Sequence, residues 1–218
     1  SSDDTQEEIR EWMKSEPKLK LCVYPWPDPK GDIDFFVNWI QFTREHCSST
    51  HILELDADEI LDERSYRACR YYNRDAPTYT LRCKRLNFWR DHRHLIPHGV
   101  CLGDSVVRLA PQEMWLPSDG AHPKGAQAVQ ASEPSNVVIF HYGFLRRRAA
   151  YFEKSKALHG FFFNGYDQRL TDAEKDTEQG GNWMEVIKNL EWRDQLVPYT
   201  GHHPAIAHQW LKSRGFEC

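Results

Sequence analysis

The sequence lacks the long apolar runs, paired cysteines and basic excess that mark several classes of protein. No apolar run approaches the roughly 20 residues that a transmembrane helix needs. The six cysteines are scattered and include no Cys-x-x-Cys pair, which fits neither a zinc knuckle nor a dense disulfide scaffold. The formal net charge of −4 at pH 7 argues against a protein that coats nucleic acid or anionic membrane indiscriminately.

The sequence also shows no internal repeat, low-complexity tract or obvious linker, so we expect residues 1–218 to form one domain. The opening residues, Ser1 to Gln6, are polar and acidic, unlike a secretory signal. We therefore expect a cytoplasmic protein with reduced thiols. Aromatic residues are plentiful, with eight Trp, nine Tyr and eleven Phe, and such rings either fill a core or stack on sugars and bases.

Hydrophobic periodicity and turn signals predict helices alternating with strands in the first half and a mixed second half. The predicted helices run from about Ser2 to Glu16, Asp32 to Cys47, Asp62 to Tyr72, Arg147 to Phe162, Asp172 to Trp192 and Pro204 to Arg214. The predicted strands are Lys20–Tyr24, His51–Leu55, Thr78–Trp89, Ser105–Leu109 and Val137–Tyr142. This arrangement indicates an α/β domain.

Two carboxylates, Asp56 and Asp58, stand two residues apart at the end of the His51–Leu55 strand. In extended chain, residues i and i+2 point to the same side, so both can face one ligand. Carboxylates held together in a partly dry cleft repel unless a cation intervenes, and Mg²⁺ or Mn²⁺ would resolve that and clamp a diphosphate. The alternative is a solvated acidic loop that caps the helix beginning near Asp62.

The segment Ile52-Leu-Glu-Leu-Asp-Ala-Asp-Glu-Ile-Leu61 closely resembles the strand-and-DxD segment of family-2 glycosyltransferases. Ser1 to Thr5 looks like the tail of that family's Ser/Asp/Thr-rich turn. The resemblance covers residues 1–61 well and residues 108–151 weakly. It implies a GT-A-like (Rossmann-like) mixed sheet flanked by helices, with a helical C-terminal part. Residues 1–61 would be the remainder of the nucleotide-sugar-binding half, and 62–218 the acceptor-side half.

By this resemblance, Asp58 would bind Mn²⁺ or Mg²⁺ directly, and Asp56 would contact the metal or the ribose of a nucleoside-diphosphate sugar. Glu59 would line the cleft floor or orient the turn. Glu54 departs from the family, which usually has an apolar residue there. The family's base-binding strands would precede Ser1, so we expect an N-terminal segment or a second chain to complete the fold.

His141 follows an apolar strand, and the resemblance makes it a candidate third metal ligand. The alternative is a buried histidine hydrogen-bonded at the edge of the sheet. His92, His94 and His98 lack a Cys or Glu partner at zinc-ligand spacing, so an acceptor-side loop is favoured over a zinc cluster. For His202-His203 and for His122, surface placement is favoured over closure on a phosphate.

An inverting transferase needs a carboxylate that takes the proton of the acceptor hydroxyl, and Asp119 is our candidate catalytic residue, although Asp119-Gly120 is also a plain turn signal. Asp104 and Glu113 are weaker alternatives, and a retaining reaction needs no such base. Arg146 to Arg148 could contact the leaving diphosphate or an anionic acceptor, although a solvated helix start is favoured for at least two of them.

The strip from Arg82 to Arg90 interleaves basic and aromatic residues in the way that nucleic-acid-binding surfaces do, although a strand with one cationic and one apolar face reads the same. We expect a metal-dependent glycosyltransferase whose acceptor is a glycan, a small molecule or a nucleic acid. The rivals are a metal-dependent phosphoesterase and a non-catalytic sugar- or nucleic-acid-binding module.

Overall fold

The computed structural model describes residues 4–24, 33–72, 80–89, 91–97, 105–111, 132–145, 150–154, 172, 175 and 196–216. Its helices are α1 (Thr5–Ser15), α2 (Ile33–Glu45), α3 (Tyr66–Tyr72) and α7 (Ala205–Ser213), with a short 3₁₀ helix η1 (Glu63–Ser65) before α3. Residues 150–154 are also helical. None of these described helices is long and apolar enough to cross a lipid bilayer.

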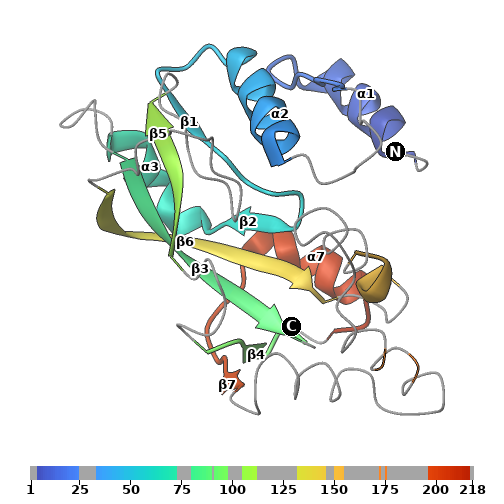
Figure 1. Cartoon of the computed structure of the whole chain (residues 1–218). Coiled ribbons are helices and arrows are strands. Elements are labelled where there is room, and N and C mark those ends of the chain that lie inside the picture. The colour runs from blue at the N-terminus through green and yellow to red at the C-terminus, as the bar shows by residue number, and fades with distance from the viewer. Residues whose placement is uncertain are drawn as a thin grey trace.

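A mixed sheet forms the centre of the protein (Figure 1). Its strands are β1 (His51–Leu53), β5 (Ser105–Pro111), β3 (Thr80–Trp89), β6 (Ser132–Phe144) and β2 (Glu59–Leu61), in that spatial order. The pair β3–β6 is parallel and the other pairs are antiparallel. Two short strands, β4 (His94–Leu95) and β7 (Val197–Pro198), extend the sheet from the end of β3.

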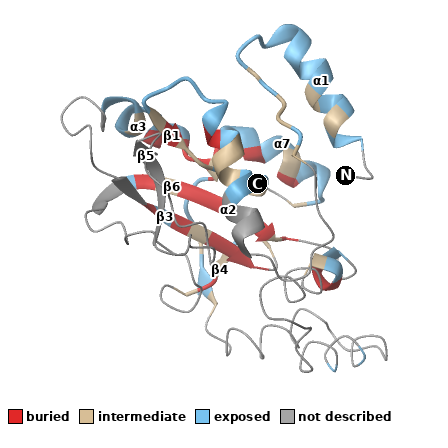
Figure 2. Ribbon diagram, turned by 45° about the horizontal axis from the view of Figure 1, so that its top comes forward, coloured by how far each residue is buried: buried red, intermediate tan, exposed pale blue. Residues whose placement is uncertain are grey.

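The two faces of the sheet carry different side chains, because neighbouring residues of a strand point to opposite sides. One face carries the buried cluster of Leu61, Cys83, Val137 and Ile139, against which Cys69 of α3 packs. The other carries an aromatic cluster built on Phe88, Phe140 and Tyr142, against which Ala207 and Leu211 of α7 pack. Buried residues run along β3 and β6 (Figure 2), so helices on both faces exclude water from the central strands.

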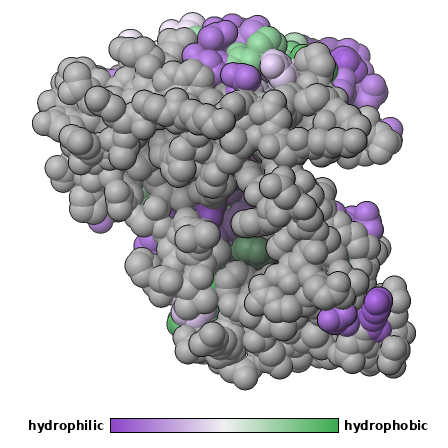
Figure 3. Space-filling view, in the orientation of Figure 1, coloured by the Kyte–Doolittle hydropathy of each residue, from purple (hydrophilic) through white to green (hydrophobic). Residues whose placement is uncertain are grey.

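Helices α1 and α2 form a separate layer beyond the β1 end of the sheet (Figure 1). Described hydrophilic residues predominate on the surface at that end of the molecule (Figure 3), and α1 has no buried residue. A partly buried ion pair joins α2 to the sheet, since the buried Arg44 on α2 contacts Glu54 just after β1. Glu54, the departure from the family pattern, is therefore a structural partner of α2.

The structure confirms an α/β fold with a mixed sheet flanked by helices, whereas the finer GT-A-like assignment stays a prediction. Helices α1, α2 and α7 and strands β1, β3 and β5 match the predicted elements to within three residues, and the predicted strand Val137–Tyr142 lies within the longer β6. The predicted strand at Lys20–Tyr24 is wrong: those residues form neither helix nor strand, and Tyr24 packs on Phe42 of α2. A short apolar run does not distinguish a strand from a segment that packs on a helix.

Further predictions depend on residues outside those described. The predicted helix Asp172–Trp192 falls there except for residues 172 and 175, and the helix from Arg147 is described only at 150–154. Asp119, the candidate catalytic residue, and its alternatives Asp104 and Glu113 also lie outside the described residues, as do Arg146 to Arg148.

Candidate functional site

The acidic turn connects two strands that lie at opposite edges of the sheet. Residues 54–58 leave β1, which pairs with β5, and enter β2, which pairs with β6. The sequence predicted a turn after a strand but missed β2, because Glu59 to Leu61 is too short a segment to show strand alternation. Asp58 consequently precedes β2 directly, and its carbonyl accepts a hydrogen bond from the Tyr142 N–H of β6 at 2.9 Å.

Glu59 holds this turn in place from the interior. Its side chain is 0% exposed, and Oε1 accepts a hydrogen bond from Nη1 of Arg85 on β3 at 3.1 Å. Oε2 accepts from the backbone N–H of Asp56 at 3.1 Å, while the Glu59 N–H donates to the Asp56 carbonyl at 2.9 Å. The resemblance implies that Glu59 either lines the cleft floor or orients the turn, and these contacts fit the second role.

A polar row crosses the sheet beside the turn, because Glu59, His141 and Asn87 are register partners on β2, β6 and β3. Nδ1 of His141 lies 2.7 Å from Oδ1 of Asn87, and Nε2 lies 3.5 Å from Oδ1 of Asp58. Both His141 and Asn87 are buried. The strand pairing therefore presents the outer nitrogen of a fixed imidazole to the carboxylate of Asp58.

Gly143 makes room for this approach. It lies two residues after His141 and faces the same side of β6. A Cβ at position 143 would lie 2.4 Å from Nε2 of His141 and 2.7 Å from Oδ2 of Asp58, well inside ordinary van der Waals contact. The carboxylate and the imidazole thus meet in the space that an alanine side chain would fill.

Asp58 is anionic at neutral pH. Burial acts to raise the pKa of its carboxyl group, but the hydrogen bond with His141 and the charge of Lys154 outweigh burial and hold that pKa below its ordinary value. Nζ of Lys154, in the helical segment 150–154, lies 2.9 Å from Oδ2 of Asp58. One oxygen of Asp58 therefore faces an ammonium group and the other faces an imidazole.

Two protonation states of His141 fit these contacts. An imidazolium donates from Nδ1 to Asn87 and from Nε2 to Asp58. A neutral imidazole that keeps its proton on Nδ1 still donates to Asn87, and its Nε2 lone pair then faces a carboxylate oxygen, an arrangement that a cation stabilises. Two ligand atoms that each lie about 2.1 Å from one metal ion are roughly 3.0 Å apart when the ligand–metal–ligand angle is a right angle. They are about 3.4 Å apart when that angle is tetrahedral. The observed 3.5 Å is close to that range, so these two residues fit a divalent ion.

Asp56 does not join Asp58 and His141 in a three-ligand group. Within the described part of the chain, the three side chains whose ligand atoms all lie within 4.8 Å of one another are Asp62, Glu63 and His202. This group could hold a metal ion. No sequence pattern pointed to it, because His202 is 140 residues from Asp62.

The contacts of this second group also explain it as a structural junction. Asp62 is buried, caps η1 through the Arg64 N–H at 3.0 Å and pairs with the Arg64 guanidinium at 3.0 Å. Oε1 of Glu63 accepts from the Ala205 N–H at 3.1 Å, at the start of α7. Burial acts to raise the pKa of Asp62, but the hydrogen bonds from Arg64 and His202 outweigh it and lower that pKa. The group ties α7 to the segment after β2.

Several other candidate residues are buried in the core. His203, predicted at the surface, is buried: Nε2–H donates to the His92 carbonyl at 2.9 Å, and Nδ1 accepts from the Tyr142 hydroxyl at 2.8 Å. His92 is also buried, which does not fit a residue of a polar acceptor-side loop. Phe88 and Trp89 are buried too, so these two rings of the basic and aromatic strip cannot stack on bases.

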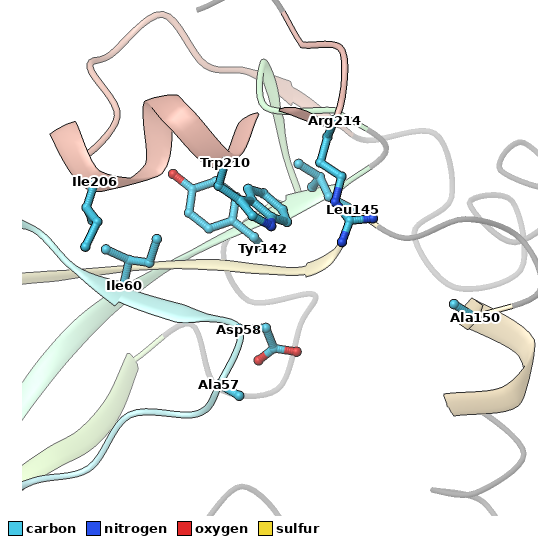
Figure 4. A pocket seen from close by; sticks show the side chains of 9 residues that line it. All are labelled: Ala57, Asp58, Ile60, Tyr142, Leu145, Ala150, Ile206, Trp210 and Arg214. Carbon is cyan, nitrogen blue, oxygen red and sulfur yellow. The ribbon is translucent and has the colours of Figure 1, made fainter. Parts of the chain in front are cut away.

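A pocket of about 410 Å³ opens beside Asp58 at the β2 edge of the sheet. Ala57 and Asp58 of the turn form one side of it, and α7 forms the other (Figure 4). Its described lining consists of Ala57, Asp58, Ile60, Tyr142, Leu145, Ala150, Ile206, Trp210 and Arg214. The carboxylate of Asp58 therefore lies at the rim of a cavity large enough for a small organic ligand.

Comparison with models of known protein families and with curated protein sequences finds no match for this chain. The resemblance to family-2 glycosyltransferases consequently stays a prediction from the sequence.

Proposed function

We propose that this protein is a metal-dependent glycosyltransferase that transfers a sugar from a nucleoside-diphosphate sugar to an acceptor. The observation that carries the proposal is the approach of His141 to within 3.5 Å of Asp58, which lies at the rim of the pocket. It supports a cation at the same aspartate that the DxD resemblance assigns to metal binding.

Asp58 and His141 would hold Mn²⁺ or Mg²⁺, and Mn²⁺ accepts carboxylate and imidazole ligands together. The bound ion would offset the negative charge that develops on the leaving nucleoside diphosphate. Asn87 would keep the proton on Nδ1 of His141 and so leave Nε2 free to bind, which is the usual function of a hydrogen-bond partner behind a metal-ligating histidine.

The positive charge of Lys154 next to Asp58 suits the same reaction. An ammonium at this position neutralises the carboxylate and, once an ion binds Asp58, can contact the diphosphate. Asp56 lies in the turn and is exposed, and it would contact the donor ribose or the ion from outside the pocket.

The test begins with binding. Titration calorimetry would measure Mn²⁺ affinity and then nucleoside-diphosphate affinity for the wild type, Asp58→Asn and, as a matched carboxylate-to-amide control on α1, Glu8→Gln. We expect Asp58→Asn to weaken Mn²⁺ binding more than about tenfold and to abolish metal-dependent binding of the nucleotide. The control should match the wild type.

Activity is the second stage. Mass spectrometry of reactions with a panel of nucleotide sugars and acceptors should show a glycosylated product that needs metal and Asp58. Metal dependence that survives Asp58→Asn would contradict the proposal. Turnover of phosphoesters without any sugar donor would favour the phosphoesterase rival, which needs two ions about 3.5–4 Å apart.

A further inference from the structure

Helix α7 presents a second stripe of side chains next to the one it buries. Ala207 and Leu211 face the aromatic cluster of the sheet. A second set of residues on α7 repeats with the same spacing of four residues and lines the pocket: Ile206, Trp210 and Arg214. Trp210 packs partly against the aromatic cluster, whereas Ile206 is 73% exposed and is the kind of apolar surface that a ligand covers.

The rest of the described lining is also mainly apolar. It includes the ring of Tyr142 and the side chains of Ile60 and Leu145. The hydroxyl of Tyr142 already donates to Nδ1 of His203, so it is engaged outside the pocket. Apart from the two charged residues, the indole N–H of Trp210 is then the main side-chain hydrogen-bonding group left in the described lining.

This lining disfavours a bare sugar. A sugar ring carries a hydroxyl on nearly every carbon, and each hydroxyl buried without a partner costs about 1–3 kcal/mol. A planar apolar group instead covers the partly exposed ring of Trp210, which itself packs against the buried ring of Tyr142 at 5.6 Å with a tilt of 53°. The shape and chemistry of the walls therefore favour an aromatic group.

Arg214 adds a charge requirement. Its guanidinium carbon lies 5.5 Å from the centroid of the Trp210 ring, and no carboxylate among the described residues pairs with it. Figure 4 shows its side chain reaching from the end of α7 toward the pocket, on the opposite side from the turn that carries Asp58. A ligand seated on Trp210 can thus place an anionic substituent against the guanidinium and a hydroxyl toward Asp58.

We propose that this pocket binds the acceptor through an aromatic group with an anionic substituent, a carboxylate or a phosphate, with the ring against Trp210 and the anion at Arg214. That this ligand is the acceptor rests on the proposed function, in which the metal-binding residue Asp58 lies at the rim of the pocket. The binding itself rests on α7 and β6 and needs neither metal nor donor.

The experiment uses the full chain without metal and four probes built on one sugar: methyl, phenyl, 4-carboxyphenyl and 4-phosphophenyl glycosides. Ligand-detected NMR and calorimetry would rank their affinities. We expect either anionic aryl probe to bind at least about tenfold more tightly than the phenyl probe, and the methyl probe to bind weakest. The two anionic probes distinguish a carboxylate ligand from a phosphate ligand.

Variants assign the contacts. Arg214→Gln should remove the advantage of the anionic probes over the phenyl probe, while Trp210→Ala should weaken all three aryl probes by about tenfold. Gln209→Ala, an exposed substitution next to Trp210 on α7, is the matched control and should change nothing. Equal binding of the methyl and aryl probes would overturn the proposal. So would an Arg214→Gln variant that loses affinity for nucleoside diphosphates but keeps its preference for the anionic probes, since Arg214 would then serve the donor.

The two proposals fail separately. If the aryl probes bind as expected but no nucleotide sugar yields a product, the pocket stands and the glycosyltransferase proposal fails. If transfer occurs to methyl glycosides and is unaffected by Trp210→Ala, the glycosyltransferase proposal stands and the pocket proposal fails.

Discussion

Gly143→Ala tests the candidate metal site without removing any of its ligands. The new Cβ would lie 2.4 Å from Nε2 of His141 and 2.7 Å from Oδ2 of Asp58, whereas ordinary contacts begin at 3.4 Å. Relief of both contacts requires movements of about 1.0 Å at His141 and about 0.7 Å at Asp58, the differences between 3.4 Å and the two distances. Metal–ligand bonds tolerate only about 0.2 Å, so the two groups can no longer bind one ion.

We expect Gly143→Ala to weaken Mn²⁺ binding by at least about tenfold in calorimetry. The free energy of unfolding should fall by about 1–3 kcal/mol, the usual cost of an overpacked interior, so the protein still folds. Urea unfolding without metal would measure that cost.

Gly201→Ala supplies a matched control. Its Cβ would lie 2.5 Å from the Tyr199 hydroxyl oxygen, so it causes a comparable overlap away from Asp58 and His141. It should lower stability to a similar degree and leave Mn²⁺ affinity unchanged. Unaltered Mn²⁺ binding in Gly143→Ala, or equal losses in both variants, would refute the assignment of the ion to Asp58 and His141.

Three predictions concern stability, measured by urea unfolding. Arg85→Met should cost about 3–5 kcal/mol, because it leaves the buried carboxylate of Glu59 without its guanidinium partner, and a double variant with Glu59→Gln should recover much of that loss. Burial lowers the pKa of His203 from 6.5 to about 4, so the neutral imidazole stabilises the folded state fully above pH 6.5. That stabilisation, about 3 kcal/mol in all, is lost as the pH falls from 6.5 to about 4. His203→Gln should therefore flatten the decline of stability between pH 6.5 and 4.5, and an unchanged slope would contradict this account. Gly215→Ala should cost about 1 kcal/mol, because Gly215 ends α7 at φ 84° with no steric contact within 4 Å, and a loss near zero would show that the strained φ relaxes.

The parts of the fold that were predictable are those whose signals are local. The apolar spacing of Asp32–Cys47 and the long alternating run of Thr78–Trp89 produce α2 and β3, because amphipathic periodicity depends on neighbouring residues alone. The family resemblance predicted that His141 and Asp58 bind one metal ion, and the structure brings the two side chains to within 3.5 Å of each other. The geometry of this approach follows from the pairing of β2 with β6, which the sequence did not reveal.

The parts that were missed depend on contacts between distant segments. The burial of His203 requires Tyr142, which is 61 residues away, and the group around Asp62 requires His202, which is 140 residues away. A histidine pair before a proline has the composition of a surface loop, and only the packing of α7 on the sheet places His203 inside. The pocket is missed for the same reason, since its lining comes from β2, β6, the segment at Ala150 and α7.

Strand β6 connects the candidate metal site to the candidate acceptor pocket. His141 and Gly143 face the side of Asp58 and Asn87, whereas Phe140 and Tyr142 face the side of α7. A shift of one residue in register would exchange these sets and destroy both sites together. Pairing with β2 on one edge and β3 on the other opposes such a shift. The distance between the two candidate sites is therefore set by the pleat of one doubly paired strand, so a substitution on one face of β6 can alter one site while the other keeps its geometry.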